Sequence, residues 1–197
     1  MENLSKEELL EFEREIKDAY EAGKMRSPVH LVGGNETQLI KIFKNINPED
    51  WVFSTHRSHY HALLKGVDKE WLKNEIFQNR SIHINNKEHK IFTSAIVGGN
   101  LSIALGVALA LKRRGSKSRV WCFIGDMAAE MGVFHECAKY ASGHDLPITF
   151  VIEDNGMSVN TPTKKVWGEK QNDSSNIIRY TYTRLYPHHG SGKWVTF

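Results

Sequence analysis

Two polar side chains stand at the ends of apolar runs in the middle of the chain. Asp126 follows the run 120–124, and Asn155 follows the run 148–152. Each run has the length and composition of a buried strand, and residues 133–141 between them show helical spacing. Two parallel strands joined by a helix end at the same edge of a sheet. We therefore expect Asp126 and Asn155 to meet there, beside a helix N-terminus that favours anions.

A carboxylate and an amide oxygen at that edge suit a hard cation such as Mg²⁺, with phosphate oxygens as its other ligands. The same two residues also allow a purely structural interpretation, in which Asp126 caps the helix and Asn155 forms a turn. These two residues alone leave both interpretations open.

A second cluster of polar side chains follows the short apolar segment that begins at Trp51. It contains His56, Arg57, His59 and His61. Clustered histidines can bind zinc, but no third ligand with suitable spacing follows them. A guanidinium group there favours a phosphate, whereas the alternative for Arg57 is a surface ion pair.

The composition of the 197 residues sets limits on function. The formal net charge of +3 and the pI near 8.8 are too weakly basic to indicate a nucleic-acid partner. We expect no membrane span and no signal peptide, since every apolar run is short and the N-terminus is charged. Cys122 and Cys137 fall on apolar faces and are expected to be free thiols in a reducing compartment. These features predict a cytoplasmic protein.

Helix-capping residues and hydrophobic periodicity predict the helices and strands around these segments. Ser5 and Glu8 form a capping box that opens an amphipathic helix. Further helices are expected over 36–45, 69–77 and 101–114, the last with a face of small residues suited to close packing against a helix or a subunit. A loop over 164–176 and a strand over 177–185 complete the expected elements.

The wider sequence resembles a known family. The segment from GDMAAEMGVFHE through LPITFVIEDN to TPT is similar to the α subunit of the 2-oxo acid dehydrogenase first components (the pyruvate, branched-chain and acetoin enzymes). Within this segment, Gly125-Asp126 is followed about thirty residues later by Asn155. This order and spacing resemble the thiamine diphosphate fingerprint. The segments VFSTHRSHYHALLKGVD and TSAIVGG also resemble family motifs, and the similarity extends from about residue 9 to residue 189.

The resemblance implies an α/β fold, in which helices flank a parallel sheet to give three layers. This would be the thiamine diphosphate-binding fold, in the form that binds the diphosphate end of the cofactor. Residues 1–197 would form one such domain, with 1–27 as an N-terminal helical arm. The implied cofactors are thiamine diphosphate and Mg²⁺. The implied magnesium ligands are Asp126, Asn155 and the backbone carbonyl of Met157.

The resemblance also implies the remaining site residues. The cofactor would be bound by His56, Arg57, Ala95, Val97, Gly125, Asp126, Met127, Ala128 and Asn155. The implied active-site histidines are His83, His188 and His189.

Three departures from the family's pattern affect this picture. His56 stands where the family has a tyrosine, and Met127 stands where it has a second glycine. The chain also looks like a short form with an internal deletion and an early stop. Met127 leaves the backbone amides in place but requires its side chain to point away from the diphosphate.

The resemblance implies a β-type partner that carries the pyrimidine-binding domain and its activating glutamate, in an α2β2 assembly, and a lipoyl carrier domain as a further partner. The implied reaction is decarboxylation of a 2-oxo acid with transfer of the acyl or aldehyde unit. Two alternatives stay open: a transketolase-like carboligase or biosynthetic decarboxylase subunit, and a silent scaffold subunit without cofactor.

Overall fold

A parallel five-stranded sheet forms the centre of the computed structural model, which describes residues 4–168 and 176–195. The strand order is β2-β1-β3-β4-β7. The strands are β1 (Trp51–Ser54), β2 (Ile91–Thr93), β3 (Val120–Gly125), β4 (Ile148–Asp154) and β7 (Ile177–Thr181). Every pairing within this sheet is parallel.

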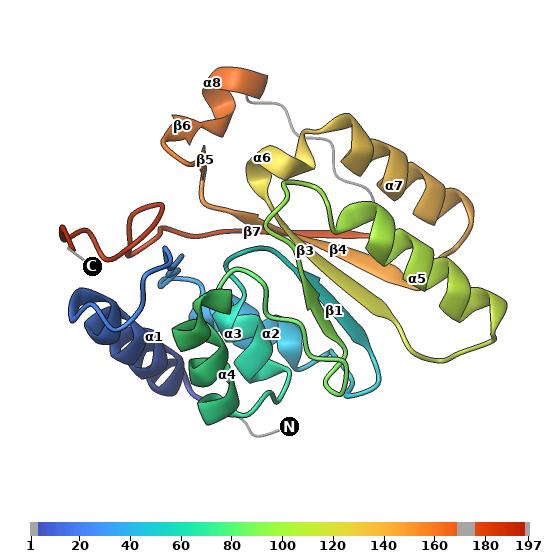
Figure 1. Ribbon diagram of the computed structural model, residues 1–197. Coiled ribbons are helices and arrows are strands. Elements are labelled where there is room, and N and C mark those ends of the chain that lie inside the picture. Colours follow the sequence, from blue (N-terminus) through green and yellow to red (C-terminus); the bar gives the residue numbers. More distant parts are fainter. Residues whose placement is uncertain (1–3, 169–175, 196–197) are drawn as a thin grey trace.

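Helices cover both faces of the sheet, so the predicted three-layer α/β class is confirmed (Figure 1). Strand β3 is buried on both sides, as expected for a central parallel strand. Trp121 and Phe123 face one core, whereas Val120, Cys122 and Ile124 face the other. The first core lies against α1 (Lys6–Glu21), α2 (Glu36–Phe43), α3 (His59–Leu64) and α4 (Lys69–Glu75), and the second against α5 (Leu101–Arg113) and α7 (Gly132–Gly143).

The first helix is part of the core. Ser5 caps it as predicted: the Glu8 amide donates to Ser5 Oγ at 3.2 Å, and the Ser5 amide donates to Glu8 Oε2 at 2.7 Å. Leu9, Phe12 and Ile16 on its inner face are fully buried, and each contributes about 1.5–3 kcal/mol in favour of folding. The helix of the predicted 1–27 arm therefore packs against the sheet domain.

The sheet has a topological switch point between β1 and β3. The chain passes from β1 outward to β2 and then returns to β3 on the other side of β1. In open parallel sheets the neighbouring strand ends diverge at such a point, and ligands bind in the crevice. Asn100 bridges the two strand ends, since its side-chain amide donates to the carbonyls of Ser54 and Phe123, each at 3.2 Å.

The structure differs from the sequence expectations around the sheet edge. A short helix, α6 (Asp126–Ala129), precedes α7, so the single helix expected after β3 is interrupted. The loop prediction over 164–176 was wrong at its start, because α8 (Thr163–Trp167) occupies it; residues 169–175 lie outside the described part of the chain. The strand expected over 177–185 ends at Thr181. A π-helical turn η1 (Ile76–Arg80) and a two-stranded antiparallel hairpin, β5 (Met157–Ser158) with β6 (Thr161–Pro162), were not anticipated.

Across residues 4–168 and 176–195 no helix is both long and apolar enough to cross a bilayer. Cys122 and Cys137 are free and buried, as the sequence predicted.

The segment that follows β7 crosses the molecule and packs on the loop before α2. The Leu185 amide donates to the Val32 carbonyl at 3.2 Å, and the Gly190 amide donates to the Val29 carbonyl at 2.8 Å. Gly34 makes this approach possible. Its φ is +100°, and a Cβ there would lie 2.2 Å from the Thr183 carbonyl oxygen.

Gly34→Ala should therefore lower the free energy of unfolding by about 2–4 kcal/mol, measured by urea denaturation. Gly106→Ala is the matched control, because Gly106 lies within α5 and a Cβ added there would meet no neighbouring atom within 4 Å. That change should stabilise the chain by roughly 0.5–1 kcal/mol. Equal stability of Gly34→Ala and the native chain would contradict this close approach of the two segments.

Candidate functional site

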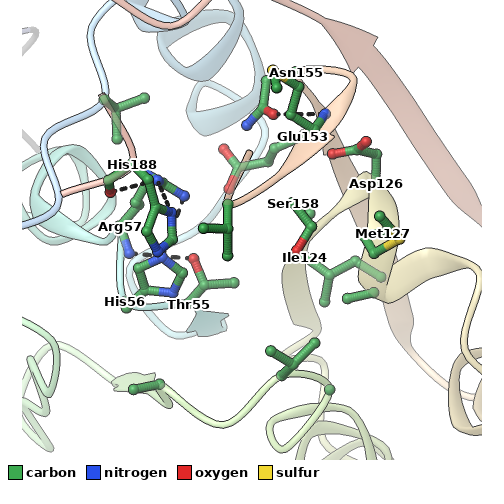
Figure 2. Close-up of a pocket in the computed structure, with 18 of the residues that line it drawn as sticks. Thr55, His56, Arg57, Ile124, Asp126, Met127, Glu153, Asn155, Ser158 and His188 are labelled. Atoms are coloured by element: carbon green, nitrogen blue, oxygen red, sulfur yellow. Dashed lines mark hydrogen bonds between the residues drawn. The ribbon is translucent and has the colours of Figure 1, made fainter. Parts of the chain in front are cut away.

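A cleft lies at the carboxyl edge of the sheet, and the ends of all five strands contribute to its lining. Its empty space, part of it open to solvent, is about 790 Å³. The strand ends and the segments after them supply Thr55, His56 and Arg57 (β1), Ser94 to Gly98 (β2), Ile124 to Ala128 (β3), Glu153 and Asn155 (β4), and Tyr182 and His188 (β7). Figure 2 shows Arg57, His56 and His188 gathered on one side and Asp126, Met127 and Asn155 on the other.

The structure brings together most of the residues that the sequence singled out. All predicted cofactor and metal residues line the cleft: His56, Arg57, Ala95, Val97, Gly125, Asp126, Met127, Ala128, Asn155 and Met157. Of the three predicted active-site histidines, only His188 does so. His83 and His189 are exposed and lie outside the lining. The roles of these side chains stay predictions.

Arg57 is the principal cation of the cleft. Its Nη1 donates to His56 Nε2 at 3.2 Å, and its Nη2 donates to the His188 carbonyl at 2.9 Å and to His188 Nδ1 at 3.1 Å. Its Nε is buried without a partner, and no carboxylate of the described chain forms an ion pair with the group. Burial lowers the pKa of Arg57. A half-buried guanidinium with an unused donor is suited to bind an anion from the cleft.

The imidazoles beside Arg57 are neutral at pH 7. A guanidinium can only donate, so His56 Nε2 and His188 Nδ1 accept and the proton sits on the other ring nitrogen. Burial, followed by the charge of Arg57, lowers the pKa of His56 to about 4 and also lowers that of His188. Each ring therefore keeps one N–H to donate.

His30 lies behind these rings and was not predicted as a site residue. Its ring centroid is 4.6 Å from that of His56 and 5.2 Å from that of His188. Burial and the neighbouring charges lower its pKa to about 3. The sequence places His30 in an unremarkable loop before Gly33, and only the fold brings it to this cluster.

Asp126 and Asn155 form the opposite side of the cleft. Asp126 is buried, which raises the pKa of its carboxyl group, and Thr163 donates its hydroxyl to Asp126 Oδ2. Asn155 Oδ1 accepts from the Met157 amide at 3.1 Å, while Asn155 Nδ2 donates to the Tyr182 hydroxyl at 3.1 Å. A carboxylate, an amide oxygen and the nearby Met157 carbonyl are the hard oxygen donors that Mg²⁺ prefers.

Two further observations concern the metal and anion sites. Among the described residues no group of three or more His, Cys, Asp or Glu side chains is arranged to hold a metal ion. The helix N-terminus expected beside Asp126 is that of α6, which begins at Asp126 and has only four residues. Arg57 is the one Lys or Arg side chain among the described residues that line the cleft.

Met127 contacts the segment of α8. Its Sδ accepts a hydrogen bond from the Trp167 indole at 3.2 Å, so the side chain is held toward α8, and Met127 also lines the cleft. That this side chain leaves room for a diphosphate stays a prediction.

Sequence reasoning missed further polar residues at the floor of the cleft. Glu153 is buried and accepts from the Tyr180 hydroxyl at 2.5 Å and from Asn35 Nδ2 at 3.3 Å. The position of Glu153, two residues before Asn155 at the same strand end, was a signal that could have identified it. Asn35 and Tyr180 carry no comparable signal, because only the fold places them beside β4.

A model of the dehydrogenase E1 component family matches residues 6–175. The chain belongs to this family. The E1 resemblance inferred from the motifs is therefore confirmed, and the match includes the β1, β2, β3 and β4 segments that line the cleft.

Curated relatives of this E1 chain come from bacteria and plants. The α subunit of acetoin:2,6-dichlorophenolindophenol oxidoreductase from Bacillus subtilis is 33% identical over 165 residues, which cover 79% of this chain and 50% of that relative. The chloroplastic pyruvate dehydrogenase E1 component subunit alpha-3 of Arabidopsis thaliana is 34% identical over 160 residues, covering 73% and 37% of the two chains. The chain thus spans about half or less of the length of these relatives.

The neutral histidines predict a pH dependence of stability. His30 and His56 have folded-state pKa values of about 3 and about 4, below the ordinary 6.5, so the unfolded state binds more protons as the pH falls. The free energy of unfolding should therefore fall between pH 6.5 and about 4, by up to about 1.4 kcal/mol per pH unit for each histidine.

The double variant His30→Gln, His56→Gln should show a shallower decrease by urea denaturation at each pH. His135→Gln, at an exposed histidine on α7, is the control and should keep the native slope. Glu13, whose pKa burial raises to about 8, contributes the opposite slope in all these proteins and cancels in the comparison. Parallel curves for the double variant and the control would show that these rings do not titrate as described.

Proposed function

We propose that this chain belongs to the α subunit of a heteromeric enzyme that uses thiamine diphosphate and Mg²⁺ to decarboxylate a 2-oxo acid and transfer the acyl or aldehyde unit. The observation that carries the proposal is the pair of facing groups in the cleft. Arg57 offers a buried, unpartnered Nε–H on one side, and Asp126 and Asn155 offer oxygen donors on the other. A diphosphate that binds both a cation and a guanidinium fits between them.

The relatives support the dehydrogenase type over the carboligase alternative. Their names describe α subunits of pyruvate dehydrogenase and of an acetoin oxidoreductase. The polar groups retained in the cleft also argue against a silent scaffold. A cytoplasmic location belongs to the same proposal and is supported by the two buried free thiols.

In this proposal each part of the cleft has a distinct task. Asp126, Asn155 and the Met157 carbonyl hold Mg²⁺, and Arg57 binds the diphosphate. Thiamine diphosphate, when bound, supplies the carbanion-stabilising chemistry that decarboxylation requires. The remaining N–H groups of His56 and His188 act as hydrogen-bond donors on the side of Arg57, and His188 is placed to hold a proton at Nε2. His83 and His189 stay predicted active-site residues, although they lie outside the cleft lining.

Arg57→Ala and Asp126→Asn should each weaken thiamine diphosphate binding in the presence of Mg²⁺. A lost charge-assisted hydrogen bond is worth about 1.5–3 kcal/mol, or roughly a 10- to 100-fold higher dissociation constant. Asp126→Asn should also weaken Mg²⁺ binding. Calorimetric titration of the chain assembled with its β-type partner measures both constants.

Arg113→Ala and Asp145→Asn serve as matched controls, because both side chains are exposed and lie outside the cleft. The controls should bind like the native chain. Unchanged cofactor affinity in Arg57→Ala and Asp126→Asn would refute the site assignment.

The proposed assembly includes a β-type subunit that carries the pyrimidine-binding domain, in an α2β2 arrangement, with a lipoyl carrier domain as acceptor. The relatives' names as α subunits support a partner. The rim of the cleft supports it as well, because Ile96 and Val97 are 75% and 61% exposed. Apolar side chains exposed next to a site are typical of a surface that another chain covers.

Ile96→Glu should therefore weaken association with the β-type partner at least tenfold, measured by light scattering on mixtures of the two purified chains. Phe77→Glu, which adds the same charge at an exposed apolar residue of η1, is the control and should associate normally. A chain that binds cofactor fully and decarboxylates a 2-oxo acid without any partner would overturn the proposed assembly.

A further inference from the structure

Two side chains outside the predicted set contact the proposed metal ligands directly. Thr163, at the start of α8, donates its hydroxyl to Asp126 Oδ2. Tyr182, just after β7, accepts a hydrogen bond from Asn155 Nδ2 at 3.1 Å. Neither residue lies near its ligand in the sequence, since 37 positions separate the first pair and 27 the second.

Thr163 is built into the site. It is 5% exposed, so its hydroxyl lies in a protected position beside a carboxylate that is itself 2% exposed. Its backbone amide also donates to the Gly156 carbonyl at 3.0 Å. Thr163 therefore joins the segment that carries Asp126 to the turn that carries Asn155.

Tyr182 restricts the orientation of the Asn155 side-chain amide. A side-chain amide has one oxygen and one nitrogen, and only the oxygen can bind a cation. The Met157 amide can only donate, so the Asn155 atom that faces it is Oδ1. The Tyr182 hydroxyl accepts from Nδ2 on the other side, and the two contacts together fix the direction in which Asn155 points.

We propose that Thr163 and Tyr182 are positioning residues that hold Asp126 and Asn155 in the orientation in which their oxygen atoms bind the metal ion. This inference rests on the proposed function of the cleft. Groups that hydrogen-bond to metal ligands restrict their rotation, and removal of such a group typically lowers metal affinity by about 10- to 100-fold. Neither Thr163 nor Tyr182 is assigned a contact with the ion itself.

The experiment removes one hydroxyl at a time. Thr163→Val and Tyr182→Phe keep the shape of each side chain and delete the hydrogen bond. In the chain assembled with its β-type partner and thiamine diphosphate, calorimetric titration with Mg²⁺ should show affinity that is about 10- to 100-fold lower in each variant. Thr163→Ser, which retains a hydroxyl, should restore affinity to near the native value.

Matched controls separate positioning from packing. Thr161→Val lies two residues before Thr163 at an exposed position, and Tyr140→Phe lies at an exposed position on α7; both should bind Mg²⁺ as the native chain does. Urea denaturation without metal should give similar unfolding free energies for Thr163→Val and Thr163→Ser. A Thr163→Ser variant as weak as Thr163→Val would show that shape, and not the hydroxyl, matters and would overturn the inference.

The remaining outcomes distinguish this inference from the proposed function. If the native chain binds Mg²⁺ and both hydroxyl-deleted variants bind it equally well, the positioning role is wrong and the proposed function stands. If the native chain, assembled with its β-type partner, binds no Mg²⁺ in the presence of thiamine diphosphate, the proposed function fails and this inference fails with it.

Discussion

The cleft depends on the divergence of β1 and β3, which are neighbours in the sheet but lead the chain to opposite sides. Asn100 maintains this divergence, because its buried amide bonds to the carbonyls of Ser54 and Phe123 where the strands separate. A buried carbonyl left unpaired at such a point costs about 1–3 kcal/mol. The Asn100 side chain thus connects the two strand ends and donates to a carbonyl of each.

The order of the strands places the cationic and the acidic side chains of the crevice on opposite sides. Arg57 and its neutral histidines follow β1 and β7, whereas Asp126 and Asn155 follow β3 and β4 and Glu153 lies near the end of β4. The sheet holds the two sets apart, so that Arg57 forms no ion pair with the carboxylates across the cleft in the described part of the chain. An arginine that was already neutralised would have little remaining attraction for an anion. The separation is therefore as important to the site as the residues themselves.

Much of this arrangement could be predicted from the sequence, and the reason is visible in particular residues. Strands β3 and β4 are buried on both faces, so they appear as continuous apolar runs, and the polar residue that ends each run marks the sheet edge. Asp126, Asn155 and Arg57 were found in this way or through their motifs. Thr163 belongs to the TPT motif, but its contact with Asp126 could not be predicted, and Tyr182 and His30 carried no signal at all, because these contacts join segments that are remote in the sequence.

The errors also have physical causes. The polar composition of 164–176 predicted a loop, but the contacts of Thr163 with Asp126 and Gly156 fix the start of α8 in spite of its weak periodicity. His83 was implied by the family resemblance alone, and the structure places its exposed side chain outside the cleft lining, so its role stays a prediction.

The crossing of the segment after β7 onto the loop before α2 bears on how the protein folds. Arg57 bonds to His188 across 131 positions of sequence, and Gly190 bonds to Val29 across a still longer interval. Contacts of such large sequence separation cost more loop-closure entropy than contacts within one element. Because β1 and β7 hold separate places in the sheet, the pairing of Arg57 with His188 requires the strand order from β1 to β7 to be complete. The Arg57 side of the cleft is thus a product of the whole sheet and not of any local segment.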